Sequence, residues 1–332
     1  MYNILLNIAK QFDKNAISVE LLTKCRNTIY KVDCADYSFI LRLSSEHHRN
    51  AEQIKSELDF QKYLFDNGAA VAQPFQTESG ETCLPLEMDN SRFICSAFEY
   101  VEGKSWDERK DNSEQIFIKI GAALGKIHKL SKEYKPVNVV KRRLWSEQQE
   151  LLKADIFKKH SMELHDKYLD FMRQMDKEEK TKDTFGLTHG DYLVSNYLIN
   201  DENDITVIDF DECEYSWFAA DLAICIRAYL FWTENPAALP QKANEAEIMH
   251  YNLLLGYGSE NKITKNMVYD LEKYIKIRDY IELAGQLSFE PEVFDDYPIE
   301  KTLFEMNLDR ILNDKPFFDG FDSQWWMFIQ KD

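Results

Sequence analysis

Long apolar runs are missing from this sequence. No stretch reaches the roughly 18 consecutive apolar residues that a membrane-spanning helix needs. The N-terminal segment MYNILLNIAKQFDKN also lacks the basic start and the apolar centre of a secretory signal. We therefore expect a soluble, cytoplasmic protein that does not associate with a membrane.

Cysteine is scarce and shows no pattern. None of the six cysteines belongs to a CxxC pair, and their spacing is not that of a small disulfide-bonded domain. This usage is typical of a reduced chain with buried thiols. The six are Cys25, Cys34, Cys83, Cys95, Cys213 and Cys225.

Basic residues are outnumbered. The 40 lysines and arginines stand against 58 aspartates and glutamates, which gives a net charge of −18 spread along the chain. Such a surface repels nucleic acid and anionic membranes and attracts cationic small molecules. With 332 residues and 44% hydrophobic content, the chain is large enough for two domains, or for one domain with two lobes.

The N-terminal part is rich in β-prone segments. Residues 27–33 and 37–44 are separated by a short polar turn, which predicts a hairpin. Residues 50–68 have the apolar spacing of a helix that ends at Gly68. Residues 92–103 read as a further apolar strand.

After residue 103 the sequence pattern becomes helical. Residues 113–131 repeat apolar side chains at helical spacing behind Ser113, which is the expected N-cap. These patterns predict an α+β fold. Residues 1–101 would form a small lobe with an antiparallel sheet and one main helix, and residues 102–332 a larger, mainly helical lobe.

The segment 187–212, LTHGDYLVSNYLINDENDITVIDFDE, contains a second expected hairpin. Strands at 197–200 and 205–208 flank the turn NDEND. We place the centre of their antiparallel pairing between Glu202 and Asn203.

Polar residues stand at the far end of both strands of this hairpin. In the expected register Asn196 and Asp209 are opposite partners, with Cα atoms roughly 4.5–5.5 Å apart. Their oxygens would lie side by side, where a hard divalent cation takes oxygen ligands. Asp191 lies in the loop that leads to the same end. Turn chemistry explains NDEND, but it does not explain these residues.

HGDYLVSN followed by VIDFDE resembles the aminoglycoside phosphotransferase and choline kinase superfamily, whose fold is that of protein kinases. The resemblance includes GAALGKIHKL, FEYVEG and DLA, and it covers residues 27–223. The tract IDFDECEYSWFAADLA resembles in particular bacterial members grouped with type II homoserine kinases. The resemblance implies a two-lobed, protein-kinase-like fold, with 1–101 as the nucleotide-binding lobe and 102–332 as the catalytic and acceptor-binding lobe.

The resemblance also implies roles for single residues. Asp191 would be the catalytic carboxylate that accepts the proton of the substrate hydroxyl. Asn196 and Asp209 would hold the Mg²⁺ that accompanies ATP. His189 would orient the loop and would not act as the base. Asp221 would be the buried aspartate that braces the catalytic loop through backbone N–H groups.

Strand alternation places Ile40 and Arg42 on one face of their expected strand. By the resemblance, Ile40 would cover the adenine, and Arg42 would reach the phosphates from the position where protein kinases carry lysine. Lys31 is the rival of Arg42 for that role, and an exposed strand arginine is the simpler alternative. Glu57 on the following helix would pair with Arg42, although a solvated glutamate remains open for Glu57 and for Glu52.

The expected nucleotide loop departs from the family pattern, because residues 1–67 contain no glycine. A glycine-free loop cannot bring its backbone as close to phosphate groups. Asn27 does match the usual residue before the second strand. The resemblance also implies that the backbone of Glu99, Tyr100 and Val101 bonds the adenine.

These assignments predict an ATP- and Mg²⁺-dependent kinase that phosphorylates a hydroxyl of an amino alcohol, an amino acid or an aminosugar. Asp211 and Glu212, with Glu214, would either attract a cationic acceptor or form a solvated loop. The glycine-free loop keeps a second class open, a nucleotide-binding scaffold without turnover. A protein kinase fits poorly, because Asp221 follows Asp209 after only 12 residues and leaves almost no room for an activation loop.

Overall fold

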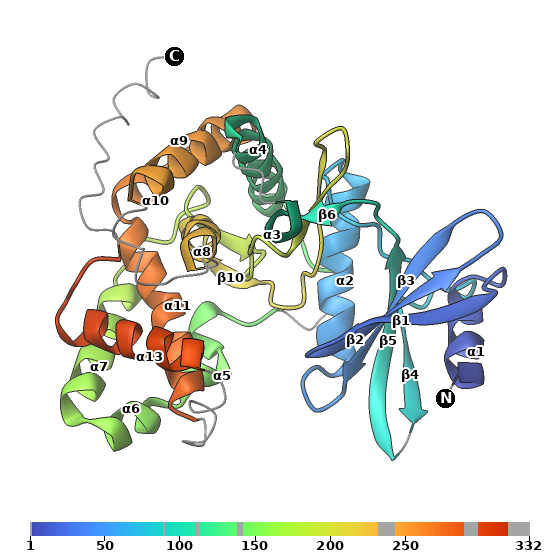
Figure 1. The fold of residues 1–332 in the computed structure, drawn as a ribbon, viewed down its shortest axis with the longest axis horizontal. Coiled ribbons are helices and arrows are strands. Elements are labelled where there is room, and N and C mark those ends of the chain that lie inside the picture. Colours follow the sequence, from blue (N-terminus) through green and yellow to red (C-terminus); the bar gives the residue numbers. More distant parts are fainter. Residues whose placement is uncertain are drawn as a thin grey trace. The chain divides into compact units, whose positions relative to one another are not determined.

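The computed structural model describes residues 2–88, 90–109, 113–137, 142–231, 243–288 and 298–317 (Figure 1). The chain forms two compact units. The first comprises Met1–Glu108, Glu133–Arg142 and Asn196–Cys213, and the second comprises Arg109–Lys132, Arg143–Ser195 and Glu214–Asp332. Two later segments therefore belong with the N-terminal part, whereas the sequence analysis places a single boundary after residue 101.

The first unit is built on a five-stranded antiparallel sheet in the order β1-β2-β3-β5-β4. The predicted hairpin of residues 27–33 and 37–44 is confirmed as β2 and β3, with Tyr30 opposite Leu41. The five strands are β1 (Ser18–Lys24), β2 (Asn27–Asp33), β3 (Ser38–Ser45), β4 (Cys83–Met88) and β5 (Ser91–Glu99).

One helix covers each face of this sheet (Figure 1). Leu41 and its like-facing neighbours on β3 are buried with side chains of α1 (Tyr2–Phe12). Ile40 points to the other face, where it packs against α2 (Ala51–Asp66). The alternation predicted for β3 is therefore confirmed. Helix α1 lies outside the sequence predictions, which give this lobe one main helix.

Helix α2 has the boundaries that its sequence predicts. The side chain of Asn50 accepts the Gln53 N–H at 2.9 Å, and the Gln53 side chain accepts the Asn50 N–H at 3.0 Å. This reciprocal pair is a capping box, which satisfies two amides at the helix start. Gly68, with φ +74°, follows the last turn. The helix carries Glu57 beneath the sheet.

A three-stranded sheet in the order β6-β8-β9 completes the first unit. Its strands are β6 (Lys104–Ser105), β8 (Tyr197–Ile199) and β9 (Ile205–Val207). Tyr197 is opposite Val207, so the predicted register is wrong by one residue. Asn196 bonds Ile208, whose N–H donates to the Asn196 carbonyl at 2.9 Å. Asp209 is therefore not its partner.

The length of the turn explains this shift. The Asn200 N–H still donates to the Asp204 carbonyl at 3.1 Å, so the loop between them has three residues. Asn203 takes φ +63°, the left-handed backbone that such loops require. A three-residue loop centres the pairing on its middle residue, Glu202, and not between Glu202 and Asn203.

The second unit is mainly helical, as predicted. Ser113 caps its first long helix, because its hydroxyl accepts the Ile116 N–H at 3.4 Å. The elements that follow β6 and lie outside the β8–β9 hairpin are α3 (Trp106–Arg109), α4 (Glu114–Ser131), η1 (Trp145–Glu147), α5 (Gln149–Leu152), α6 (Ala154–His160), α7 (Met162–Asp176), β7 (Phe185–Thr188), β10 (Glu214–Trp217), α8 (Phe218–Phe231), α9 (Ala243–Glu260), α10 (Lys265–Tyr269), α11 (Leu271–Gln286) and α13 (Pro298–Leu312).

Close helix packing and a short strand pair position the loop after β7. Gly121 on α4 and Gly256 on α9 leave no room for a Cβ atom, so the backbones of these helices meet directly. Strands β7 and β10 pair antiparallel, with Thr188 opposite Glu214. The next residues after Thr188 are the HGD triplet.

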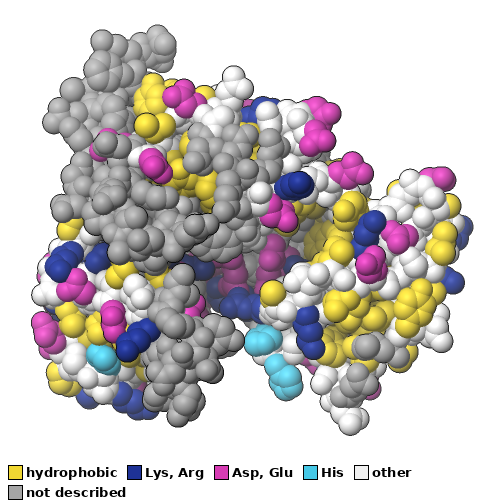
Figure 2. All heavy atoms as spheres, in the orientation of Figure 1, with side chains coloured by type: hydrophobic (Ala, Val, Ile, Leu, Met, Phe, Trp, Pro, Cys, Tyr) yellow, Lys and Arg dark blue, Asp and Glu magenta, His cyan; other side chains and the backbone are white. Residues whose placement is uncertain are grey.

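The surface fits the composition. Acidic side chains lie scattered among basic ones on the face that Figure 2 shows. All six cysteines are free, and each except Cys25 is buried, which confirms the prediction of buried thiols. Within the described ranges, no helix combines the length and the apolar character needed to cross a membrane.

Candidate active site

The first unit contains a cleft of about 380 Å³. That volume lies in the range of small-molecule sites. Its wall includes every residue of the predicted nucleotide and metal set except Asn27 and Glu57. The lining residues are Leu22, Thr23, Ile29, Ile40, Arg42, Gln61, Ala72, Phe98, Glu99, Tyr100, Val101, Gly103, Asn196, Leu198, Ile208 and Asp209.

Most of this wall is apolar. Ile29 and Ile40 come from the large sheet, Phe98 comes from the end of β5, and Leu198 and Ile208 come from the β8–β9 hairpin. Apolar side chains from two sheets suit a flat heterocycle.

Glu99 at the end of β5 and the two residues after it line the same cleft. The Glu99 N–H donates to the Gln73 carbonyl at 2.9 Å, so the protein already uses this amide. Tyr100 and Val101 line the cleft as well, which makes them the better candidates for backbone bonds to a ligand.

Arg42 and Glu57 form a buried, two-pronged ion pair, which confirms the predicted pairing. Nη1 and Nη2 of Arg42 donate to the two carboxylate oxygens of Glu57 at 2.7 and 2.9 Å. Nε donates to Ser96 Oγ at 3.2 Å, and the guanidinium lies 5.0 Å from the centre of the Phe98 ring. The alternatives of an exposed Arg42 and a solvated Glu57 are therefore wrong. Lys31 instead pairs with Asp33 at 3.2 Å, outside the cleft lining.

Burial and charge act against each other in this pair. Burial by itself would lower the pKa of the Arg42 guanidinium, but the attraction of Glu57 outweighs it and the pKa is raised. Burial raises the pKa of the Glu57 carboxyl, and the two bonds from Arg42 oppose that shift. Two short bonds to both oxygens fit an ionised carboxylate.

Asn196 and Asp209 both line the cleft, although they are not paired in the hairpin. Asp209 Oδ1 is 3.8 Å from Arg42 Nη1, and its side chain is 47% exposed. Asp209 also takes φ +61°. A non-glycine residue holds this conformation at a cost of roughly 1–3 kcal/mol, and such residues cluster at functional sites.

This pair of side chains suits Mg²⁺ better than a metal that needs a full protein cage. Among the described residues, no group of three or more His, Cys, Asp or Glu side chains is arranged to hold a metal. Mg²⁺ bound with a nucleotide commonly takes one or two protein oxygens, and phosphates and waters complete its shell.

Asn27 lies at the start of the second strand, where the sequence places it. It lies outside the cleft lining. Its carbonyl accepts the Cys25 N–H at 3.0 Å and so closes the turn between β1 and β2.

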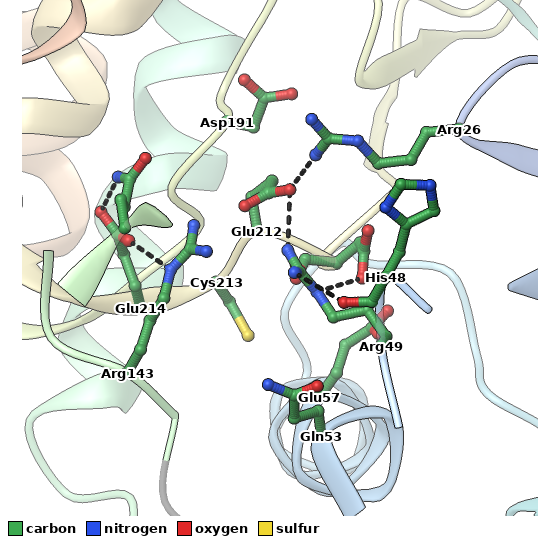
Figure 3. Close-up of polar contacts among 12 residues, drawn as sticks. Arg26, His48, Arg49, Gln53, Glu57, Arg143, Asp191, Glu212, Cys213 and Glu214 are labelled. Carbon is green, nitrogen blue, oxygen red and sulfur yellow. Dashed lines mark hydrogen bonds and ion pairs between the residues drawn. The ribbon is translucent and has the colours of Figure 1, made fainter. Parts of the chain in front are cut away.

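Arginines neutralise the acidic residues that follow Asp209 (Figure 3). Arg49 pairs with Asp211 at 3.1 Å and with Glu212 at 2.8 Å, and Arg26 pairs with Glu212. Asp211 is buried, so the prediction of a solvated loop is wrong for it. Burial alone would raise the pKa of Asp211, but nearby arginines, with Arg42 first among them, hold it below its ordinary value.

Two further arginines hold the same stretch of chain, each within its own unit. In the first unit, Arg142 donates to the carbonyls of Cys213 at 2.7 Å and of Gln53 at 3.0 Å. In the second unit, Arg143 pairs with the buried Glu214 at 3.0 Å (Figure 3). Sequence reasoning missed these arginines. Their signal is the KRR run at 141–143.

Asp221 braces the loop after β7, as predicted. It is fully buried in the first turn of α8. Its Oδ2 accepts the His189 N–H at 2.7 Å, and its Oδ1 accepts the Gly190 N–H at 2.9 Å. His128 Nε2 lies 3.0 Å from Oδ2. Burial lowers the pKa of His128, and the bond to Asp221 opposes this shift.

His189 has the geometry of an orienting residue. Its ring is buried, and its Nδ1 accepts the backbone N–H of Asp191 at 3.3 Å. The Asp191 carboxylate pairs with Arg278 on α11, with 3.1 Å between Nη1 and Oδ1. Sequence reasoning missed Arg278, because nothing near it in the sequence marks it as a neighbour of the HGD triplet.

Comparison with known proteins defines the class. Residues 20–251 match the model of the phosphotransferase enzyme family APH, and the chain belongs to this family. The chain is therefore a phosphotransferase, and the predicted superfamily is confirmed.

Two kinds of relative are similar to this chain over most of its length. Amicoumacin kinase of Bacillus subtilis (strain 168) is 24% identical over 277 residues, which cover 83% of this chain and 81% of the relative. A solved amicoumacin kinase, hAmiN in complex with AMP-PNP, Ca²⁺ and Ami, has a TM-score of 0.82 at 21% identity and covers 98% and 96% of the two chains. The microcompartment-associated aminopropanol kinase has a TM-score of 0.69 at 17% identity and covers 97% and 99%.

These likenesses confirm the predicted α+β, protein-kinase-like fold. The relatives are named as kinases of small molecules, so a scaffold without turnover is not favoured.

Proposed function

We propose that this protein transfers the γ-phosphoryl group of ATP to a hydroxyl group of a small organic acceptor, with Mg²⁺. The observation that carries the proposal is the cleft of the first unit. It combines apolar walls with a locked arginine, Arg42, and with two oxygen donors, Asn196 and Asp209.

We assign nucleotide binding to this cleft. Ile40 and Phe98 would enclose the adenine, and the backbone of Tyr100 and Val101 would bond its edge. The Arg42 guanidinium would bond phosphate oxygens from a position fixed by the Glu57 carboxylate. A planar guanidinium suits this role, because it presents several donors in a rigid arrangement.

Asn196 and Asp209 would hold Mg²⁺, which neutralises the charge that develops on the phosphoryl group. Their exposure to the cleft fits this role. The nearby Arg42 balances the negative charge of Asp209.

We assign the second unit the acceptor chemistry. Asp191 would accept the proton of the acceptor hydroxyl as the new O–P bond forms and the bond to the ADP oxygen breaks. The bonds from Asp221 to the amides of His189 and Gly190 would hold this loop in one conformation.

The acceptor class that we favour is an amino alcohol or a natural product that carries one. The named relatives, amicoumacin kinase and aminopropanol kinase, support this choice. Asp211 and Glu212 give no support to a cationic acceptor, because arginines of their own unit already pair with them.

The test is a coupled assay that measures ADP release from MgATP in the presence of one candidate acceptor at a time. The acceptors are amicoumacin, aminopropanol, choline, homoserine and spectinomycin. We expect at least one acceptor to raise ADP release. The variant Asp191→Asn should lower kcat for that acceptor by about 10²-fold or more, as loss of a catalytic base does.

The matched control is Asp201→Asn, which makes the same chemical change at an exposed residue of the hairpin turn. It should retain wild-type kcat. Silence of the wild type with every acceptor, together with no binding of MgATP, would contradict the proposal.

A further inference from the structure

Arg278 joins Asp191 to a partly buried network of charges in the second unit. Its Nη1 faces Asp191 Oδ1 at 3.1 Å, and its Nε donates to Glu282 Oε1 at 3.2 Å. Arg278 and Glu282 stand four residues apart on α11, the spacing at which helical side chains meet. Both ends of the guanidinium group are thus in use.

Glu282 is itself fixed from the other side. Arg227 on α8 donates to its two oxygens at 2.7 and 2.6 Å and, through Nε, to Asp279 at 2.9 Å. Arg310 on α13 pairs with Asp279 at 2.9 Å. Burial alone would raise the pKa of Glu282, but Arg227 and Arg278 outweigh it and the pKa is lowered.

The signs of the charges alternate along this network. Three arginines alternate with three carboxylates, so every neighbouring pair along the network attracts. Its members in spatial order are Arg310, Asp279, Arg227, Glu282, Arg278 and Asp191.

Arg278 lines a small cavity together with Gly190 of the braced loop and Asp221 of α8. The volume of this cavity is about 20 Å³, which is room for about one water molecule. An organic acceptor does not fit in this cavity.

We infer that Arg278 is a positioning residue for the phosphoryl transfer proposed above, on which this inference rests. Its guanidinium forms an ion pair with Asp191 Oδ1, a buried oxygen of that carboxylate. Oδ2 is then the oxygen that receives the acceptor proton. Arg227 and Glu282 fix Arg278, so α8 and α11 set the orientation of the catalytic carboxylate.

The experiment compares the wild type with Arg278→Ala and Arg278→Lys, using the acceptor found in the panel. We expect Arg278→Ala to lower kcat by about 10- to 10²-fold, the cost of a misplaced catalytic group. KM for ATP should not change. Arg278→Lys keeps the charge and should retain intermediate kcat. Added guanidinium ion should restore part of the activity of Arg278→Ala.

The matched control is Arg173→Ala, which removes an exposed arginine from α7 of the same unit. It should behave as the wild type. Melting temperatures of all variants show whether loss of activity reflects loss of fold. If Arg278→Ala does not fold, the inference is tested on Arg278→Lys, whose kcat should lie below that of the wild type.

Three results would overturn the inference while the wild type is active. These are an unchanged kcat in Arg278→Ala, a loss confined to KM for the acceptor, and a loss that neither lysine nor guanidinium repairs. An inactive wild type would instead overturn the proposed function, so the two failures are distinguishable.

Discussion

In the described part of each unit, a buried arginine binds both carboxylate oxygens of a glutamate. Arg42 donates to both oxygens of Glu57 at 2.7 and 2.9 Å, and Arg227 donates to both oxygens of Glu282 at 2.7 and 2.6 Å. Both arginines are buried. The surroundings differ, because Arg42 lines an open cleft, whereas Arg227 is enclosed by further ion pairs, with Asp279 as a second partner.

This difference in surroundings gives the two arginine–glutamate pairs different roles. Arg42 has one carboxylate at hydrogen-bond distance, Glu57, and its Nη1 lies 3.8 Å from the half-exposed Asp209 beside the open cleft, so it can serve a ligand. Arg227 donates its hydrogen bonds to Asp279 and Glu282 within the protein. We expect the first arginine to act mainly on nucleotide binding and the second mainly on stability.

The largest effect should come from Arg227→Met. It leaves the buried Asp279 and the partly buried Glu282 with less compensation, which should cost about 3–5 kcal/mol of unfolding free energy. Urea unfolding measures this loss, and Arg173→Met is the control on the exposed face of α7. A loss below about 1 kcal/mol, the range of surface pairs, would remove the distinction between buried and exposed arginines.

The next effect is a difference in acid stability, because the second unit buries His250, whereas the histidines in the described part of the first unit, His47 and His48, are exposed. Burial lowers the pKa of His250 to about 4, from an ordinary value of 6.5. The unfolded chain therefore binds a proton more readily, so His250 favours the folded state fully above about pH 6.5. This contribution, about 3 kcal/mol, should be lost as the pH falls from 6.5 to 4.

Unfolding free energies at pH 7 and pH 5 measure this loss, in the wild type and in His250→Gln. The variant should show a weaker dependence on pH across that window. An equal dependence in both proteins would mean that His250 is not the responsible group.

The smallest effect should come from Arg42→Lys. Lysine keeps the charge but presents no planar fork, so one of the two bonds to Glu57 is lost. We expect KM for ATP to rise about tenfold, equivalent to about 1.4 kcal/mol. Arg227→Lys makes the same change in the second unit and should leave KM for ATP unchanged. An equal rise of KM for ATP in Arg42→Lys and Arg227→Lys would mean that the position of Arg42 in the cleft does not explain its effect on ATP binding.

The two arginines also show how far the sequence carries a prediction. Arg42 and Glu57 are 15 residues apart, and strand alternation with the following helix brings them together. Arg227 and Glu282 are 55 residues apart on separate helices, and no local pattern relates them. The same holds for Asp191 and Arg278.

Local backbone geometry limits prediction in another way. The strands of the β8–β9 hairpin are predicted at the right residues, but their register is wrong, because Asn203 adopts the left-handed backbone of a three-residue loop. Asn196 and Asp209 still line one cleft, since Asp209 leaves the strand with φ +61°.

We assign MgATP binding to the first unit and the catalytic carboxylate to the second. The most direct test of this assignment is a calorimetric titration of MgATP into the wild type, Asp209→Asn and Asp191→Asn. We predict that Asp191→Asn binds MgATP as tightly as the wild type, and that Asp209→Asn binds it much more weakly. Weakened binding in Asp191→Asn with unchanged binding in Asp209→Asn, or no binding to the wild type, would contradict the account.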